Sequence, residues 1–209
     1  MIDFVFDGPV EARCGVILAH GAGAPMDSPF MIKYAEGIAA KGIRVARFEF
    51  PYMTRRRKDG RRRPPDRAPV LIECWQAAVE QMVLTGLPRE SLFIGGKSLG
   101  GRIASMIADE AGVAGLVCLG YPFHPPGKPE RTRVDHLQSL GTSTLIVQGE
   151  RDSLGTYADV ENYTLSPAIR LHWLADGEHS FKPRKGSGRT EQQNWEEGIA
   201  AVVEFVNGL

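Results

Sequence analysis

The chain has 209 residues, and its 25 Lys and Arg balance 25 Asp and Glu, so its formal net charge is zero. A neutral chain lacks the broad positive field that nucleic-acid binding needs, so no nucleic-acid partner is expected. Hydrophobic residues make up 43% of the chain, as in an ordinary globular protein. The length suits a single domain over residues 1–209.

Three cysteines stand far apart, at Cys14, Cys74 and Cys118, each within an apolar run or stripe. Buried free thiols are the expected state, which favours a reducing compartment. The N-terminus has no basic start followed by an apolar core, and no apolar run approaches the ~18 residues of a membrane span. A cytoplasmic protein without membrane contact is therefore expected.

In chain order, the predicted elements alternate between strand-like apolar runs and helical periods. They are an edge strand over 2–6, a strand over 14–19, a helix over 30–38, a strand over 43–48, a helix over 71–83, a strand over 92–94, a helix over 99–107, strands over 115–119, 144–148 and 169–174, and a last helix over 195–206. Several strand runs are continuously apolar, which is typical of a parallel sheet covered on both faces. The pattern predicts an α/β fold with a doubly wound, mostly parallel sheet of about six or seven strands.

A glycine-rich turn follows the predicted strand over 92–94. The sequence Gly96-Lys97-Ser98-Leu99-Gly100 matches G-x-S-x-G between a strand and an amphipathic helix, the context that this nucleophile motif requires. Small residues two before and two after the serine let the neighbouring chains pass. The hydroxyl would stand at a helix N-terminus, where the dipole favours developing negative charge. Ser98 is therefore the predicted nucleophile.

The same turn allows two other interpretations. Gly96-Lys97-Ser98 resembles the end of a phosphate-binding loop, but the position of that motif's first glycine holds Ser91, and Leu92–Ile94 is strand-like. A nucleotide site is therefore not expected. The other interpretation is a strand–helix turn with an incidental serine, and a matching base and acid argue against it.

A nucleophilic serine needs a base and an orienting acid, in the chain order serine, acid, histidine in this context. Of the five histidines, His179 alone falls between the last predicted strand and the last predicted helix. Asp152 follows the strand over 144–148 and is the predicted acid, with Glu150 and Asp176 as alternatives. For His179, the alternative is a solvated loop histidine.

Two backbone N–H groups are expected to hold the oxyanion. One belongs to Leu99, directly after the nucleophile, and the other to Ala22, in the small-residue turn after the first core strand. His20, in the same turn, is expected to brace the loop through hydrogen bonds. Lys97 is expected to pair with an acid such as Glu49 rather than to act in catalysis.

In this order, a histidine-glycine turn, G-x-S-x-G, G-x-x-D and a late histidine resemble the α/β-hydrolase superfamily, over about residues 13–207. More narrowly, the chain resembles a small family of testis-expressed hydrolase-like proteins, which also contains a subunit of the non-specific-lethal chromatin complex. The segments that carry this resemblance are 20–24, 26–30, 48–53, 96–102 and 120–128. The chain is also similar to the capless dienelactone hydrolases, but those enzymes use a cysteine where this chain has Ser98. The resemblance implies an α/β-hydrolase fold and no particular substrate.

Two long loops, over 52–67 and 121–133, are expected to border the serine. Tyr121, Phe123 and His124 are the candidate substrate-binding residues, with packing of a surface loop as the alternative. No segment is long enough for a large cap domain, so a shallow and open site is expected.

The segment Arg55–Arg67 carries seven Arg and one Lys against two Asp, a local charge of +6. It is interpreted as a mobile solvated loop, as a wall that attracts anionic substrates, or as a patch for nucleic acid or an acidic partner. The second interpretation predicts faster hydrolysis of anionic than of neutral esters at low salt.

Together these residues predict hydrolysis of a small-molecule carboxylic ester, or a related acyl bond, through an acyl-enzyme. No metal or organic cofactor is implied. Esterase, thioesterase and peptidase activities are not separable by this pattern, and the oligomeric state is not indicated. The alternative from another class is a protein-interaction module on a hydrolase scaffold.

Overall fold

The computed structural model describes residues 2–209, and over these residues the chain forms one seven-stranded sheet in the order β1-β3-β2-β4-β5-β6-β7. β1 runs antiparallel to β3, and every other neighbouring pair is parallel. The strands are β1 Val5–Asp7, β2 Gly15–Ala19, β3 Arg44–Phe48, β4 Leu92–Lys97, β5 Gly115–Leu119, β6 Thr144–Gly149 and β7 Ile169–Leu174. The α-helices are α1 Pro29–Ala39, α2 Pro51–Asp59, α3 Ala68–Val83, α4 Leu99–Ser105, α5 Ala108–Ala111, α6 Tyr157–Val160 and α7 Glu191–Asn207.

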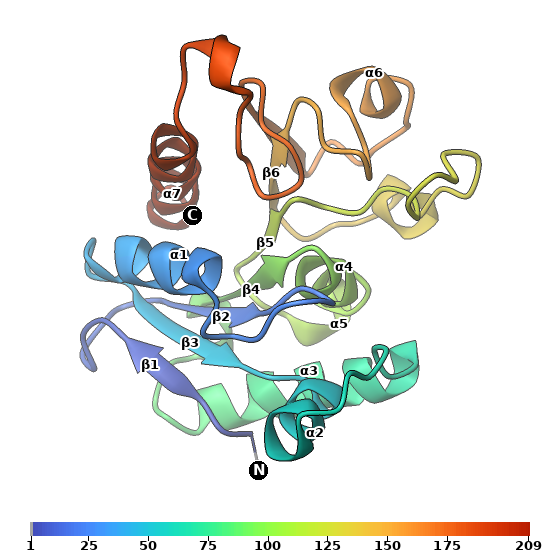
Figure 1. The fold of residues 1–209 in the computed structure, drawn as a ribbon. Helices are drawn as coiled ribbons and strands as arrows, with labels where there is room; N and C mark the ends of the chain where they lie inside the picture. The colour runs from blue at the N-terminus through green and yellow to red at the C-terminus, as the bar shows by residue number, and fades with distance from the viewer. Residues whose placement is uncertain (1) are drawn as a thin grey trace.

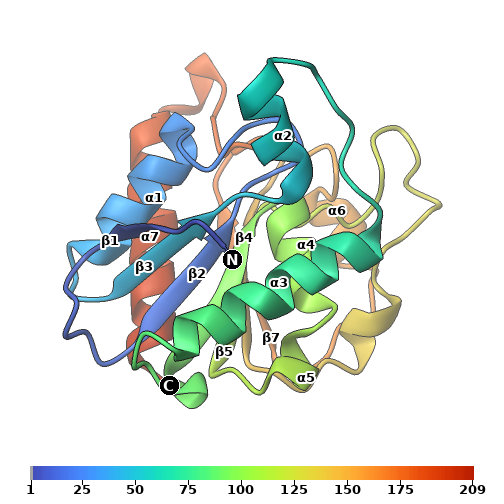
Figure 2. The same ribbon diagram turned by 90° about the horizontal axis from the view of Figure 1, so that it is seen from below.

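Helices cover both faces of the sheet, as Figures 1 and 2 show. α1 and α7 pack side by side on one face, where Tyr34 and Val202 meet the strand side chains Val16 and Val117. α3 and α4 cover the other face, where Trp75 and Ile103 pack against Ile17 and Ile94. Burial on both faces explains why the central strands are continuously apolar. The expected doubly wound α/β fold is confirmed.

The centre of the sheet depends on glycines where backbones approach closely. A Cβ on Gly95 would lie 1.8 Å from the carbonyl oxygen of Val117 on β5, and a Cβ on Gly96 would lie 2.0 Å from that of Ala19 on β2. A Cβ on Gly100, in α4, would lie 2.3 Å from the same Ala19 oxygen. The turn between β4 and α4 therefore sits directly against the end of β2.

Most predicted elements lie within a few residues of their observed positions, but α2 was expected to be loop. Pro51 begins this helix and Gly60, in the left-handed conformation at φ 70°, ends it. Only Tyr52 and Met53 are buried, so the helix shows no apolar stripe along its basic length. The predicted helix over 99–107 ends slightly earlier, as α4, and the separate short helix α5 follows it.

All three cysteines are unpaired, with Cys74 and Cys118 buried and Cys14 half-buried. Burial raises the pKa of Cys74 to about 11, so this thiol stays protonated at neutral pH. Over residues 2–209, none of the helices combines the length and the apolar character that a bilayer crossing requires.

Replacing Gly95 by Ala is expected to lower the free energy of unfolding by about 2–3 kcal/mol, because the new methyl group overlaps the backbone of β5. Urea unfolding followed by circular dichroism measures this change. Gly186→Ala is the matched control, since a Cβ there meets nothing within 4 Å and should change stability by less than about 0.5 kcal/mol. Equal stability of the two variants would contradict the close approach of β4 and β5.

Candidate functional site

Ser98 stands in a sharp turn between β4 and α4 at the carboxyl edge of the sheet. Its backbone adopts φ 49° and ψ −108°, a conformation that non-glycine residues rarely take. The turn is held because the Ser98 N–H donates to the carbonyl of Leu119, at 3.0 Å, and because Gly96 and Gly100 fit against Ala19. The strained turn presents the side chain of Ser98 above the start of α4.

Asp152 lies in the turn after β6 and is completely buried. Its Oδ2 is 2.7 Å from Nδ1 of His179, and it also accepts a hydrogen bond from the Gln148 amide at 3.0 Å. Its Oδ1 accepts the N–H of Leu154 at 2.9 Å. A carboxylate with three N–H donors is well satisfied despite its burial.

The two alternative acids have other partners. Glu150 accepts the N–H of Asp176 at 2.8 Å. The carboxylate of Asp176 pairs with Arg151 at 2.9 Å and also with Arg184. The structure therefore brings Asp152, and neither of these carboxylates, to His179.

His179 sits in the loop between β7 and α7, and α7 holds that loop on the sheet. Trp195 donates its indole N–H to the Ser180 carbonyl at 2.9 Å, and Asn194 donates to the Phe181 carbonyl at 2.7 Å. Over residues 2–209, no hydrogen bond joins Ser98 to His179, although both line the same cleft. Such a bond is often long before a substrate binds.

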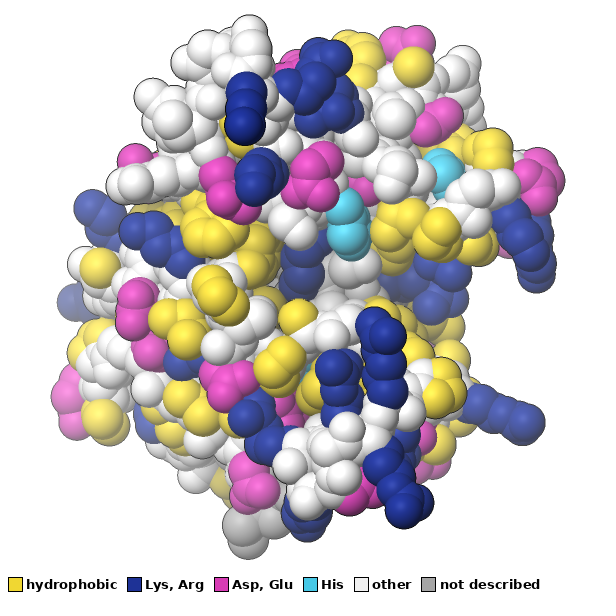
Figure 3. Space-filling view, in the orientation of Figure 1, with side chains coloured by type: hydrophobic (Ala, Val, Ile, Leu, Met, Phe, Trp, Pro, Cys, Tyr) yellow, Lys and Arg dark blue, Asp and Glu magenta, His cyan; other side chains and the backbone are white. Residues whose placement is uncertain are grey.

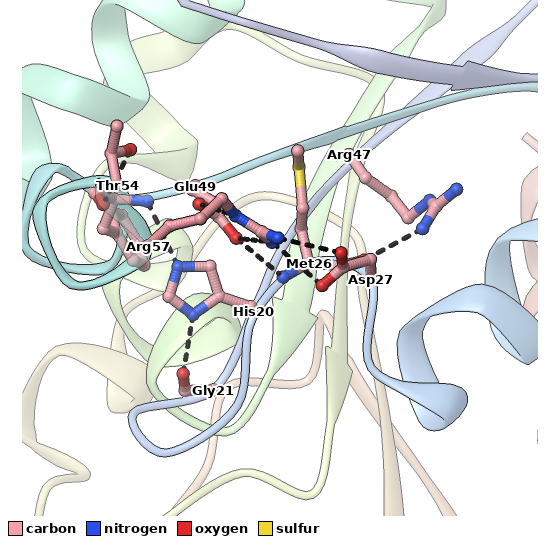
Figure 4. Close-up of polar contacts among 9 residues, drawn as sticks. His20, Gly21, Met26, Asp27, Arg47, Glu49, Thr54 and Arg57 are labelled. Carbon is pink, nitrogen blue, oxygen red and sulfur yellow. Dashed lines mark hydrogen bonds and ion pairs between the residues drawn. The ribbon is translucent and has the colours of Figure 1, made fainter. Parts of the chain in front are cut away.

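A turn of small residues after β2 faces the serine, and His20 braces it as expected. His20 lies 2.7 Å from the Gly21 carbonyl through Nδ1, which must carry the proton because a carbonyl only accepts. Nε2 then accepts the N–H of Phe50 at 3.2 Å (Figure 4). Burial lowers the pKa of His20, which favours this neutral form. Tyr52 adds hydrogen bonds from its hydroxyl to the carbonyls of Gly21 and Ala22.

A cleft of about 550 Å³ opens beside the serine and is mostly apolar on its walls. It is lined by Gly21, Ala22, Gly23, Ala24, Ser28, Pro29, Phe30, Met31, Lys97, Ser98, Leu154, His179, Ser180, Glu191 and Trp195. Figure 3 shows hydrophobic side chains on both sides of the hollow that crosses this face. Within residues 2–209, no group of three His, Cys, Asp or Glu side chains is placed to hold a metal ion.

Tyr121, Phe123 and His124 do not lie on this wall, which corrects the expectation that they line the substrate pocket. All three side chains are buried, and Phe123 packs against Gly155. The Tyr121 hydroxyl donates to the Arg133 carbonyl at 3.0 Å. The proline-rich segment folds inward at this point because its aromatic side chains join the core beneath the loop.

The functional residue that sequence reasoning missed is Gln148, at the end of β6. Its amide nitrogen donates to Asp152 and also to the carbonyls of Tyr121 and Gly155, while its oxygen accepts the Tyr121 N–H at 2.7 Å. Gln148 thereby fixes the carboxylate that orients His179. The sequence signal that could have identified it is the position of Gln148 as a polar residue at the end of an apolar strand run.

Lys97 is buried and does not pair with Glu49, which corrects that expectation. Its Nζ donates to the backbone carbonyl of His179 at 2.5 Å and lies 5.4 Å from the ring of Phe30 and 5.5 Å from that of Phe181. Burial lowers the pKa of Lys97 to about 8, against opposing effects from the charges of Asp152 and Glu178.

Glu49 belongs instead to a network that anchors the basic segment Arg55–Arg67. Arg57 pairs with Glu49 at 2.5 Å and with Asp27 at 2.9 Å (Figure 4). Asp66 and Asp59 each pair with an arginine of the segment itself. Arg56 reaches the turn beside the serine and donates to the Gly23 carbonyl at 3.1 Å. Several arginines of the segment are therefore engaged in local ion pairs, which neutralise much of its positive charge.

The strand order and the turn that carries Ser98 define the α/β-hydrolase class of fold. Residues 12–207 match the family model of the alpha/beta hydrolase domain, so the chain belongs to that family.

Three solved structures illustrate the likeness. An alpha-beta serine hydrolase homologue from Coxiella burnetii is 18% identical, with a TM-score of 0.72 over 97% of this chain and 89% of that one. A dienelactone hydrolase from Anabaena variabilis is 20% identical, with a TM-score of 0.75 over 99% and 91%. A monoacylglycerol lipase from Paleococcus ferrophilus is 14% identical, with a TM-score of 0.71 over 100% and 99%. At these identities, the likeness is one of fold.

The lowered pKa of the buried Lys97 ammonium leads to a prediction of how stability depends on pH. Between pH 8 and 10.5 the native chain has released this proton while the unfolded chain still holds it, so stability rises with pH. The free energy of unfolding of the wild type is expected to rise by roughly 3 kcal/mol relative to Lys97→Met across this window. Urea unfolding of both proteins at several pH values measures the difference.

Lys41→Met is the matched control, because Lys41 is exposed and should show no such trend. A constant difference between the wild type and Lys97→Met from pH 7 to 10.5 would contradict the lowered pKa.

Proposed function

We propose that the chain is a serine hydrolase that cleaves a carboxylic ester, or a related acyl bond, of a small molecule through an acyl-enzyme. The observation that carries the proposal is the joint placement of a strained Ser98 and an Asp152-bonded His179 on one cleft. A serine in a strained strand–helix turn beside an oriented histidine is the arrangement that activates a hydroxyl. The hydrolase family of the chain supports the same reaction class.

In this mechanism, His179 takes the proton of Ser98 and the alkoxide attacks the substrate carbonyl. Because Nδ1 of His179 faces Asp152, Nε2 is the nitrogen left to act as the base. Asp152 holds the ring in this orientation and stabilises the imidazolium that forms. Water then attacks the acyl-enzyme, with His179 acting again as the base, and releases the acid.

The oxyanion is held in this proposal by the N–H groups of Leu99 and Ala22. Leu99 is the first residue of α4, so its N–H has no partner within the helix. Ala22 lies on the cleft wall, and within residues 2–209 its N–H makes no hydrogen bond. The Tyr52 hydroxyl donates a hydrogen bond to the Ala22 carbonyl at 3.2 Å, which restrains the peptide bond that follows Ala22. Such preorganised donors stabilise the charge that develops in the transition state.

We place the chain near the small capless hydrolase-like proteins that its motifs resemble, since the described cleft opens directly to the surface in Figure 3. The unpaired state of its three cysteines supports a cytoplasmic setting.

Ser98→Ala is expected to lower the hydrolysis of p-nitrophenyl butyrate by roughly 10⁴-fold or more, because the nucleophile is removed. Labelling by a fluorophosphonate probe should disappear in the same variant. Ser28→Ala is the control, since Ser28 lines the same cleft and its side chain makes no capping hydrogen bond. Persistent labelling of Ser98→Ala would identify another nucleophile, and no labelling of the wild type would favour a scaffold role.

Asp152→Asn is expected to lower kcat by roughly 10⁴-fold with little change in fold. The amide of Asn favours the His179 tautomer that carries its proton on Nε2, so this nitrogen cannot accept the proton of Ser98. Steady-state kinetics on the same ester measure the loss. Glu150→Gln should retain activity, since Glu150 binds the Asp176 backbone rather than His179. If Glu150→Gln were as damaged as Asp152→Asn, the assignment of the acid would be wrong.

A further inference from the structure

The turn after β2 lies directly against the nucleophile. A Cβ on Gly21 would lie 3.7 Å from the Cβ of Ser98. Residues 22–24 follow on the wall of the cleft that also holds Ser98. Over the described residues 2–209, the N–H groups of residues 22–24 make no hydrogen bond. The turn therefore offers successive backbone donors beside the serine.

The carbonyl groups of the same turn are bound by two side chains of α2. The Tyr52 hydroxyl lies 3.3 Å from the carbonyl oxygen of Gly21 and 3.2 Å from that of Ala22, so its single proton is shared between them. Nη1 of Arg56 donates to the Gly23 carbonyl at 3.1 Å. In the described part of the chain, the walls of the cleft include neither Tyr52 nor Arg56. Three consecutive carbonyls are therefore held from outside the cleft.

The geometry of the peptide bond links these carbonyls to the N–H groups of the turn. The carbonyl and the N–H of a trans peptide point in opposite directions within one plane, and every peptide bond of residues 2–209 is trans. The Gly21 carbonyl shares its plane with the Ala22 N–H. The next two peptides pair the carbonyls of Ala22 and Gly23 with the N–H groups that follow them. Holding the carbonyls toward α2 therefore turns the three N–H groups away from α2 and toward the cleft.

The two donors of α2 are themselves well placed for this contact. Tyr52 and Arg56 are four residues apart, so both project from one face of the helix. Tyr52 and the adjacent Met53 are buried, which fixes the start of α2 in the core. Burial raises the pKa of the Tyr52 hydroxyl, and the charge of Asp66 raises it further against the effect of Arg56, so the hydroxyl keeps its proton. Arg56 is half-buried, and the structure over residues 2–209 gives it no ion pair.

A second set of contacts anchors the segment that leaves the turn (Figure 4). Glu49 accepts the N–H of Met26 at 3.4 Å, and Arg47 donates to the Met26 carbonyl at 2.9 Å. Arg57, also on α2, pairs with both Glu49 and Asp27. The helix α2 therefore holds the turn along its carbonyls and again at its exit.

We propose that Tyr52 and Arg56 are positioning residues that hold the oxyanion turn, residues 21–24, with its N–H groups directed toward the carbonyl that Ser98 attacks. The proposal rests on the proposed function. It assigns the basic helix α2 a role in catalysis in which Arg56 binds a backbone carbonyl rather than an anionic substrate. Without the two donors the peptides of the turn rotate more freely, so the oxyanion loses directed N–H groups in the transition state.

Tyr52→Phe and Arg56→Met remove the two donors. Each is expected to lower kcat on p-nitrophenyl butyrate by roughly 10- to 100-fold with KM changed by less than about 3-fold, because misplaced N–H groups weaken binding of the transition state. Arg56→Lys keeps a cationic donor and should recover most of the lost kcat. A change in KM alone, or an unchanged kcat in both Tyr52→Phe and Arg56→Met, would overturn the proposal.

Inhibition by 1,1,1-trifluoro-2-hexanone tests the oxyanion directly. Ser98 adds to the ketone carbonyl, its proton passes to His179, and the ketone oxygen becomes an oxyanion. The inhibition constant should rise in Tyr52→Phe and Arg56→Met by the same factor by which kcat/KM falls. An unchanged inhibition constant would show that the two side chains do not act through the oxyanion.

Lys58→Met is the matched control for Arg56→Met. Lys58 is an exposed cation on the same helix, and within residues 2–209 its side chain makes no hydrogen bond or ion pair. This variant should keep the kcat and the inhibition constant of the wild type. An equal loss in Lys58→Met would attribute the effect to the charge of α2 and overturn the assignment of Arg56. Circular dichroism checks that every variant is folded.

Backbone ¹⁵N order parameters separate this test from that of the proposed function. In the wild type the N–H groups of residues 22–24 should have values near about 0.85, as in rigid backbone, and these should fall toward about 0.6 in Tyr52→Phe and Arg56→Met. Such a fall supports the role of α2 even if no ester is cleaved. Unchanged order parameters would overturn the positioning role, while labelling of the wild type by fluorophosphonate would leave the hydrolase proposal standing.

Discussion

The contact between the backbones of β4 and its two neighbours is the constraint on which the rest of the site depends. Gly96 and Gly100 both lie against the Ala19 carbonyl, and no side chain fits at either place. This contact lets α4 begin directly at the sheet and forces Ser98 into its unusual backbone conformation. The same approach brings the turn after β2 opposite the serine, and within residues 2–209 the Ala22 N–H of that turn makes no hydrogen bond. The packing of the central strands therefore also determines the geometry of the site.

Buried charge is the second organising feature, and the site handles its two signs differently. Asp152 is satisfied by three directed N–H groups, one of which belongs to Gln148. Lys97 has one backbone carbonyl and two aromatic faces, a poorer substitute for water. The cost of this burial explains why its pKa falls to about 8. Lys97 lies against the His179 loop, and its ammonium supplies the hydrogen-bond donor for the backbone carbonyl of His179.

Sequence reasoning recovered the sheet and its helices because the apolar runs are continuous and the chain order of an α/β fold limits the choices. It assigned Ser98, Asp152 and His179 as the catalytic residues by requiring each to follow a different strand, since the carboxyl ends of parallel strands share one edge. The structure places Asp152 against His179 and lines one cleft with His179 and Ser98, while their catalytic roles stay a prediction. The oxyanion donors assigned on the same grounds stay a prediction.

The rest depends on contacts that no local pattern shows. α2 has capping residues but no apolar stripe, so its basic sequence looked like a solvated loop. Tyr121 and Phe123 were expected to line the substrate pocket, with packing of a surface loop as the alternative, whereas their rings fill the core under the loop. Lys97 was expected to pair with an acid such as Glu49, whereas it binds a backbone carbonyl that lies 82 residues away in the chain.

The contacts between α7 and the loop that carries His179 affect the order in which the parts of the cleft are fixed during folding. Asn194 and Trp195 donate hydrogen bonds to the carbonyls of Phe181 and Ser180, directly after His179, and both follow His179 in the chain. During synthesis, therefore, a nascent chain can complete the Ser98 turn and the Asp152 turn while the loop that carries His179 is still without its α7 contacts. Docking of α7 is the step that fixes the His179 loop against the sheet. The Ser98 turn and Asp152 can thus be in place before the loop that carries His179 is fixed by its contacts with α7.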